Sequence, residues 1–448
     1  MSASPSSGPS SARPCTTARS RFAAPPCRGD TVDVADAAFE PLSAPFDPAG
    51  FVREHRARLV GMLVRWCGDV QLAEDAFGDA IERALTAWPA SPPADPYAWV
   101  VVVAKNRVRD ILRSAEHRRN RALDETDELR ADTRPPTRDD DTLALMFACV
   151  HPMLDRGVHA PLILQVVLGV STVDIATSFA LPSATLSKRL VRAKQKLRAD
   201  RDAFEVPAGI PRERVAAVLD AIYAAYSIEW LRVAPADSAE RVTDEAVHAS
   251  QLMLTALPHD HEVRGLAALL LYLHSRRSAR FRDETLVPTE QQDTALWDAE
   301  LIGRAERLLH AGMSTARTAP PGPFEWEAAI QSAHSARRRS GVTDWETIAQ
   351  LYNALVHVTP RKGARVARVV AIARVTDPAI GLRALEQLAD EDPTMLRFQP
   401  YHAARGALLL ECGDALSARR SMQRALDLCT HGPSRRWLSK QIAGIPVS

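Results

Sequence analysis

The stretch that decides the fold is Pro182-Ser-Ala-Thr-Leu-Ser-Lys-Arg-Leu-Val-Arg-Ala-Lys-Gln-Lys-Leu-Arg-Ala-Asp200. From Ser183 to Arg201 it holds seven basic residues and one acidic residue, whereas the whole chain of 448 residues has a net charge of +1. If the stretch is a helix, one face is apolar and carries Leu186, Leu190, Ala193 and Leu197. The opposite face carries Thr185, Lys188, Arg189, Arg192 and Lys196. One face can pack while the other offers cations and hydrogen-bond donors, which predicts a helix for the major groove of DNA.

A second, shorter helix is predicted just before this one, from Thr172 to Phe179. Ala180-Leu181 forms the turn, and Ser183 is predicted to cap the basic helix. The inward contacts at this corner are predicted to be Ile175, Ala176, Phe179 and Leu181. A helix, a tight turn and a basic amphipathic helix are typical of a helix-turn-helix. We therefore expect residues 141–206 to form a helix-turn-helix domain.

Residues 46–121 are predicted to form another helical block. Its helix from Val70 to Trp88 has an apolar stripe and an acidic outer face, made of Glu74, Asp75, Asp79 and Glu82. A further helix runs to Arg119 and starts at Asp95-Pro96, a capping residue followed by proline in the first turn. From Tyr97 to Arg121 there are seven basic and two acidic residues, a net charge of +5.

The helix that ends at Arg119 carries the residues expected to contact a nucleic acid. They are Trp99, Lys105, Asn106, Arg109, Asp110 and Arg113. A cationic helix with an asparagine and an aromatic residue can follow phosphates and can stack on or hydrogen-bond to unpaired bases. The alternative interpretation of each charged face is a solvated surface without a partner.

Composition favours an all-α protein, because aromatic residues make up only 6% and β-rich chains usually contain more of them. The chain has no run of 18 apolar residues, and residues 1–30 lack the apolar core of a signal peptide. We expect a cytoplasmic protein without a membrane segment. Residues 1–45 are predicted to be a disordered tail, and residues 122–140 an acidic linker. The six cysteines show no metal-type pairing and are expected to be reduced thiols.

Residues 207–448 are predicted to be a helical extension, interrupted by prolines. Tyr401 to Leu428 is expected to form two antiparallel helices. Small residues recur seven apart in each helix, namely Gly406 and Gly413, then Ala418 and Ala425. This spacing is typical of tetratricopeptide repeats. One hypothesis is a groove for a protein or peptide regulator of this C-terminal domain, and the alternative is a structural lid without a ligand.

Signals of an enzyme are weak. The chain has no glycine loop for phosphates and no nucleophile elbow. The densest metal-like cluster is His259-Asp260-His261-Glu262, but it lies at a predicted helix start, where Asp and Glu are ordinary capping residues. We therefore expect no catalytic residues, no metal and no cofactor.

The two helical blocks and their acidic linker resemble bacterial sigma factors of the extracytoplasmic-function (ECF) group, in the sigma-70 family. The resemblance to conserved region 2 is carried by Leu72-Ala73-Glu74-Asp75-Ala76, by Ala80–Ala84, and by Ala98-Trp99 with Val103–Arg113. The resemblance to region 4 is carried by Ile175-Ala176, Leu181–Thr185 and Arg189–Arg198. These motifs span about a third of the chain.

The resemblance implies a role for each set of residues. Glu74, Asp75, Asp79 and Glu82 would bind core RNA polymerase. Trp99, Lys105, Asn106, Arg109, Asp110 and Arg113 would open and read the −10 element of promoter DNA. Ser183, Thr185, Lys188, Arg189, Arg192 and Lys196 would read the −35 element. The implied function is that of an alternative sigma factor, which directs promoter-specific initiation of transcription.

The C-terminal half is similar to a subgroup of these sigma factors that has a long helical extension. The similar motifs include Glu262–Leu270, Ser275–Arg280, Gln292-Asp293, Leu296–Asp298, Gly322–Phe324 and Thr343–Trp345. The chain departs from the family at two places. Gly78-Asp79 replaces a common Gln-Glu pair, and Ser227–Trp230 replaces an Asn-Glu-Gly-Tyr-like stretch.

Two other hypotheses remain open from the sequence. One is a stand-alone helix-turn-helix regulator that uses the helical half as a sensor. The other is a helical-repeat scaffold. A sigma factor should depend on core polymerase for its binding to promoter DNA, whereas a regulator should not.

Overall fold

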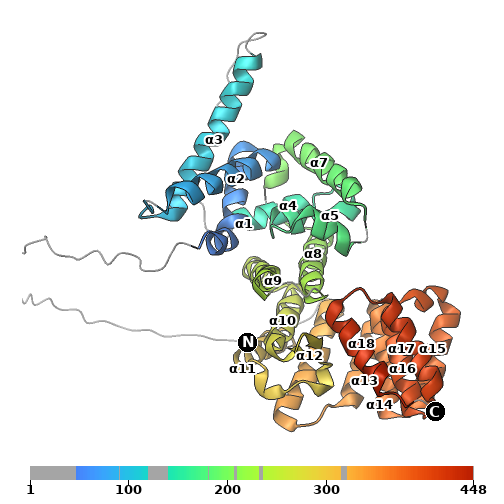
Figure 1. Ribbon diagram of the computed structural model, residues 1–448. Helices are drawn as coiled ribbons and strands as arrows, with labels where there is room; N and C mark the ends of the chain where they lie inside the picture. Colours follow the sequence, from blue (N-terminus) through green and yellow to red (C-terminus); the bar gives the residue numbers. More distant parts are fainter. Residues whose placement is uncertain are drawn as a thin grey trace, which may run out of the picture. The chain divides into compact units, whose positions relative to one another are not determined.

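The computed structural model describes residues 47–89, 91–119, 140–179, 181–205, 209–231, 236–313 and 320–446. The described residues are almost entirely helical, which confirms the predicted all-α class (Figure 1). The predicted tail and nearly all of the acidic linker lie outside the described residues. None of the described helices combines the length and apolar character needed to cross a membrane.

The first block consists of α1 (Pro48–Cys67), α2 (Val70–Ala87) and α3 (Pro96–Arg119). Gly68 ends α1 in the left-handed region, at φ 70°, and its N–H donates to the carbonyl of Val64. Asp69 then caps α2, because its carboxylate accepts from the backbone N–H groups of Gln71 and Leu72 at 2.9 and 3.2 Å. One glycine and one aspartate therefore produce the tight corner between α1 and α2.

The second block consists of α4 (Asp140–Cys149), α5 (Arg156–Val166), α6 (Thr172–Ser178), α7 (Ser183–Ala199) and the 3₁₀ turn η1 (Arg201–Phe204). α6 and α7 lie where the sequence predicted them and pack against each other. Two details of the prediction were wrong. Phe179, predicted to face inward, is 37% exposed and lies at the C-terminal cap of α6, one residue after the helix ends. Ser183 is the first helical residue and makes no capping bond.

The next segment holds α8 (Arg212–Leu231), α9 (Ala236–Ala256), α10 (His261–Ser275), α11 (Ala299–Met313) and α12 (Pro323–Ser340). Between α10 and α11 lie η2 (Arg277–Ala279), β1 (Phe281–Arg282), β2 (Thr285–Leu286), η3 (Thr289–Gln291) and η4 (Thr294–Leu296). The two short strands form an antiparallel hairpin in which Phe281 is paired with Leu286. No pattern in the sequence predicts this hairpin.

The predicted capping role of the His259–Glu262 cluster is confirmed for Asp260, whose carboxylate accepts from the N–H of Val263 at 3.0 Å. Glu262 has a different role, because it accepts from the N–H groups of Phe324 and Glu325, both at 3.2 Å. The carboxylate of Glu262 thus satisfies the first turn of α12 from a position 62 residues earlier in the chain.

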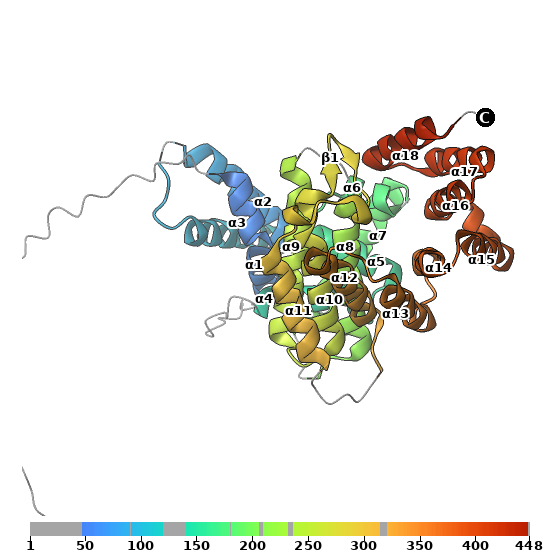
Figure 2. The same cartoon turned by 90° about the horizontal axis from the view of Figure 1, so that it is seen from below.

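The C-terminal helices are α13 (Trp345–Val358), α14 (Lys362–Val375), α15 (Pro378–Glu391), η5 (Pro393–Arg397), α16 (Gln399–Glu411), α17 (Ala415–Leu428) and α18 (Gly432–Gly444). Each packs on the next, and the two views show them side by side (Figures 1 and 2). The predicted helix pair within 401–428 is confirmed as α16 and α17. Gly406 permits their close approach, since a Cβ atom there would lie 2.8 Å from Met422 Cγ. Gly413 instead forms the turn, at φ 83°.

A single cluster of buried apolar side chains extends from Phe51 in α1 to Ala328 in α12, and three smaller clusters fill the C-terminal helices. α8 belongs to the large cluster and packs against α5. Val218, Leu219 and Ile222 of α8 are at most 1% exposed. Arg214 of α8 also donates to the carbonyl of Phe147 in α4 at 2.6 Å. The helices on either side of the predicted junction near residue 207 therefore share one continuous core.

We predict that a chain ending at Val206 is much less stable than a chain ending at Gly341. The shorter chain loses the apolar face of α8, and each buried Val, Leu or Ile contributes about 1.5–3 kcal/mol. Thermal unfolding followed by circular dichroism should show a midpoint at least about 10 °C lower for the shorter chain, or no cooperative transition. The chain ending at Gly341 keeps the large cluster and serves as the control. Equal midpoints would contradict this shared core.

Candidate functional site

α7 has the two faces that the sequence predicted. Its apolar residues Leu186, Leu190, Ala193 and Leu197 are buried. The six residues predicted to contact DNA are all exposed, namely Ser183, Thr185, Lys188, Arg189, Arg192 and Lys196. Lys196 also donates to the carbonyl of Met153 at 3.3 Å. The exposed face is dense in cations and suits contact with phosphates and base edges.

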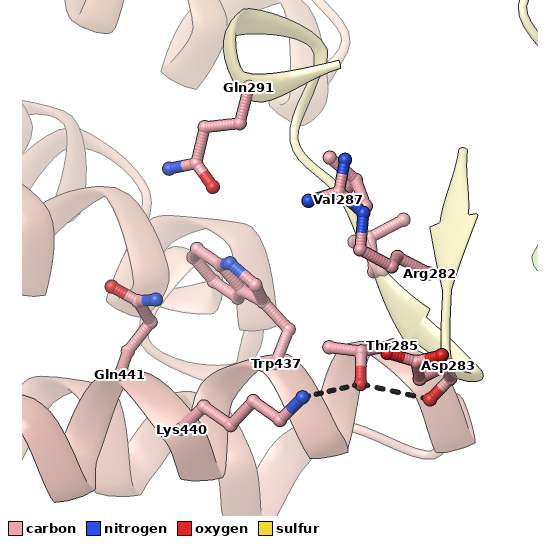
Figure 3. A pocket seen from close by; sticks show the side chains of 9 residues that line it. Arg282, Asp283, Thr285, Val287, Gln291, Trp437, Lys440 and Gln441 are labelled. Carbon is pink, nitrogen blue, oxygen red and sulfur yellow. Dashed lines mark hydrogen bonds between the residues drawn. The ribbon is translucent and has the colours of Figure 1, made fainter. Parts of the chain in front are cut away.

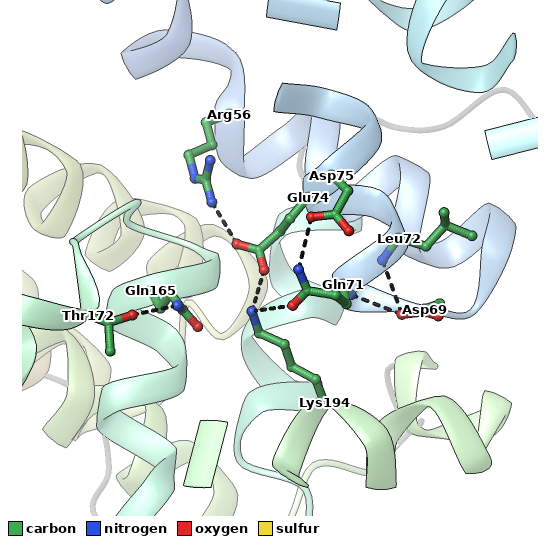
Figure 4. A network of polar contacts seen from close by, with 9 residues as sticks. All are labelled: Arg56, Asp69, Gln71, Leu72, Glu74, Asp75, Gln165, Thr172 and Lys194. Carbon is green, nitrogen blue, oxygen red and sulfur yellow. Dashed lines mark hydrogen bonds and ion pairs between the residues drawn. The ribbon is translucent and has the colours of Figure 1, made fainter. Parts of the chain in front are cut away.

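Lys194, also on α7, is a functional residue that the sequence did not predict. Its side chain is only 7% exposed and points towards α2 rather than towards solvent (Figure 4). Its Nζ donates to Glu74 Oε2 at 2.5 Å and to Gln71 Oε1 at 3.2 Å. The ammonium group thus joins two segments that are 120 residues apart in the chain.

Glu74 does not lie on the outer face of α2, which corrects the prediction. Its side chain is 12% exposed, and its other carboxylate oxygen accepts from Arg56 of α1 at 2.7 Å (Figure 4). The physical reason is that this turn of α2 faces α1 and α7, so Glu74 lies between two cations. Arg56 and Lys194 compensate a carboxylate that would be costly to bury alone.

Two further contacts join the second block to the first. Arg198, one turn after Lys194, lies 3.1 Å from the carboxylate of Asp69, which also caps α2. Arg65 of α1 lies 3.1 Å from Asp141, whose side chain is 4% exposed. α1 and α4 approach closely at Gly61, where a Cβ atom would lie 2.6 Å from the carbonyl oxygen of Asp141. We call the Arg56–Glu74–Lys194 cluster with the Asp69–Arg198 pair the α2–α7 clasp.

The remaining acidic residues of α2 differ in accessibility. Asp75 and Glu82 are exposed, as predicted. Asp79 is half-buried and forms an ion pair with Arg107 of α3. The accessible part of the acidic face is therefore centred on Asp75 and Glu82, which lie two turns apart.

α3 exposes Asn106, Arg109, Asp110 and Arg113, while Lys105 is half-buried. The charged ends of Lys105 and Arg109 both lie over the ring of Trp66, at 5.6 and 5.4 Å from its centroid. Trp99 is also half-buried and packs edge-on against Trp88, with ring centroids 5.4 Å apart. The cations of α3 are accessible to a nucleic acid, and Trp99 offers only part of its ring.

No group of three or more potential metal ligands occurs among the described residues. Burial raises the pKa of the Cys67 thiol to about 11 and raises that of Cys149 as well. Both thiols are therefore protonated at neutral pH and are poor nucleophiles.

Comparison with known proteins assigns two segments of the chain. A model of sigma-70 region 2 matches residues 51–118, and a model of a family of unknown function (DUF6596) matches residues 214–313. Uncharacterized protein R00370 of Rhizobium meliloti is 34% identical over 401 residues, which cover 86% of this chain and 93% of that protein. The probable ECF RNA polymerase sigma factor SigI of Mycobacterium tuberculosis is 29% identical over 161 residues, or 34% of this chain and 55% of that protein. No solved structure matches the chain significantly.

We predict that Lys194→Ala lowers the free energy of unfolding by up to about 3 kcal/mol, because it removes one partner of a buried ion pair while Arg56 still compensates Glu74. Urea denaturation measures this change. Lys196→Ala, which alters an exposed lysine two positions later, is the control and should change stability by less than about 0.5 kcal/mol. If the two variants were equally stable, the α2–α7 clasp would contribute nothing.

Proposed function

The chain belongs to the same family as the Rhizobium meliloti protein and contains a sigma-70 region 2 domain in α1–α3, and from this we propose that it is an alternative sigma factor of the ECF group. The region 2 match over α1–α3 carries this proposal. The similarity to the probable ECF sigma factor of M. tuberculosis supports it. Such a protein makes no covalent bonds itself, because the polymerase carries out the chemistry.

Two helices supply the contacts to promoter DNA in this proposal. α3 opens and reads the −10 element through Trp99, Lys105, Asn106, Arg109, Asp110 and Arg113. α6 and α7 act as a helix-turn-helix, and α7 enters the major groove at the −35 element with Ser183, Thr185, Lys188, Arg189, Arg192 and Lys196. The exposure of these α7 side chains supports this role. Each phosphate contact adds affinity that decreases as salt concentration rises.

The acidic face of α2 is the proposed docking surface for core RNA polymerase. Asp75 and Glu82 are accessible to a partner without any rearrangement. Glu74 is held by Lys194, and Asp79 is held by Arg107. In this proposal the polymerase therefore binds first through Asp75 and Glu82, and it gains Glu74 only when α7 moves away from α2.

The C-terminal helices are the proposed regulatory part. α13–α18 form a row of packed helices, which suits a tetratricopeptide-like surface for a protein or peptide regulator. α8–α12 connect this row to the second block through the shared core. A regulator bound to the row could therefore act on the DNA-binding block through rigid packing rather than through a loose linker.

Run-off transcription with purified core polymerase and a pool of promoter fragments tests this function. The full-length chain should produce specific transcripts. Asp75→Arg with Glu82→Arg should lower their yield at least tenfold, because it reverses the accessible charges of the docking surface. Asp390→Arg, at an exposed site on α15, is the matched control and should leave the yield unchanged.

The same assay distinguishes a stand-alone regulator from a sigma factor. A regulator would bind promoter fragments equally well with and without core polymerase. Its binding to DNA would also be unchanged by Asp75→Arg with Glu82→Arg. That outcome, together with the absence of transcripts, would contradict the sigma-factor proposal.

A further inference from the structure

A small pocket lies between the β1–β2 hairpin and α18, away from the helices proposed to contact DNA and core polymerase (Figure 3). Its volume is about 240 Å³. Trp437, Lys440 and Gln441 line it from α18, and Arg282 and Gln291 line it from the hairpin and from η3. Since a water molecule occupies about 30 Å³ of liquid, the pocket has room for a compact organic molecule.

The hairpin wall is fixed by bonds to α18 rather than by its own two-residue strands. Arg436 donates to the carbonyl of Glu284 at 2.8 Å and lies 3.3 Å from its carboxylate. Lys440 donates to Thr285 Oγ1 at 3.0 Å. These partners are 152 and 155 residues apart in the chain, so the pocket forms only in the complete fold.

The turn of the hairpin is strained. Asp283 and Glu284 have φ values of 50° and 56°, in the left-handed region that side chains with a Cβ disfavour. Such a backbone persists only where its surroundings hold it, and it is enriched at sites that clamp ligands. The bonds from Arg436 and Lys440 hold this turn, and the wall is therefore formed before any ligand arrives.

The pocket offers hydrogen-bond donors that are not used by the protein itself. Arg282, Gln291 and Lys440 are exposed. Within the described part of the chain, the side chains of Arg282, Gln291 and Gln441 make no hydrogen bond to the protein, and Lys440 uses one of its three N–H groups. Two cations and one carboxylate, that of Asp283, line the pocket, which leaves a surplus of one positive charge. The walls therefore favour a ligand that carries a negative charge and accepts hydrogen bonds.

His431 beside the pocket and Trp437 in its wall indicate which kind of ligand fits. Burial, together with the charges of Arg280 and Arg436, lowers the pKa of nearby His431 to about 4, so this imidazole is neutral at pH 7. The indole of Trp437 supplies a flat apolar wall, and its buried N–H has no acceptor. Figure 3 shows this ring opposite Val287 and Arg282, with Lys440 at one end of the pocket and Gln291 at the other.

We propose that this pocket binds a small organic carboxylate, with its carboxylate on Lys440 and Arg282 and its flat or apolar body against Trp437. Such a ligand satisfies the unused donors and covers the indole. The site does not depend on the role of the chain in transcription. It makes the C-terminal part a receptor for a small molecule as well as a packing partner of the second block.

Saturation-transfer NMR on the full chain, without polymerase or DNA, tests the proposal. The probes are two carboxylates, benzoate and succinate, together with benzamide, which is a neutral analogue of benzoate with a similar shape, and inorganic phosphate, which is a simple oxyanion. At least one carboxylate should bind with a dissociation constant of about 1 mM or lower. Benzamide should bind at least tenfold more weakly than benzoate. Stronger binding of phosphate than of either carboxylate would overturn the assignment to a carboxylate.

Two variants locate the binding. Arg282→Gln and Lys440→Gln should each weaken carboxylate binding at least tenfold. Arg282 is exposed, and its side chain makes no hydrogen bond or ion pair within the described residues, so its loss should not perturb the fold. Lys362→Gln, which neutralises a lysine on α14, should leave binding unchanged. The absence of binding by both carboxylates, or equal binding by all three variants, would overturn the proposal. Either result would leave the transcription assay unaffected.

Discussion

One largely buried carboxylate ties together the first two helical blocks, which also share an apolar core. Glu74 lies between Arg56 of α1 and Lys194 of α7, at 2.7 and 2.5 Å, and little of it reaches solvent. A buried charge is tolerated only when oppositely charged groups and hydrogen bonds compensate it. Because one of these groups comes from α7, the charge of Glu74 ties the proposed DNA-binding helix to the proposed polymerase-binding helix. The same interaction therefore stabilises this arrangement and keeps Glu74 out of reach of a partner at the proposed docking surface.

Local patterns in the sequence predicted much of the fold. The 3.6-residue periodicity of α7 was sufficient to predict its buried face, and the small residues of α16 and α17 were sufficient to predict that these helices pair. Each pattern depends only on residues that are close in the chain. The burial of Lys194 and Glu74 could not be predicted in this way. A lysine in a basic helix looks the same whether it faces water or a carboxylate 120 residues away. The same holds for Glu262, whose partners are the first residues of α12.

The β1–β2 hairpin could not be predicted from the residues of its turn. Tight hairpins usually contain Asn-Gly or Asp-Gly at the positions with positive φ, and this turn contains Asp283-Glu284. Contacts with α18 stabilise it instead, so no local pattern reveals it. The shared core has a similar origin, since α8 follows a proline- and glycine-rich junction and nevertheless packs on α5. Tertiary contacts thus join segments that composition separates.

Control of the proposed activity would then depend on how easily the α2–α7 clasp opens. The most direct measurement is the distance between spin labels on α2 and α7, attached through non-natural amino acids at the exposed positions Arg83 and Gln195. Electron–electron resonance should give one short distance for the free chain and a longer distance once core polymerase is bound. A polymerase complex that keeps the short distance would show that the clasp remains closed, and it would contradict the proposed movement of α7.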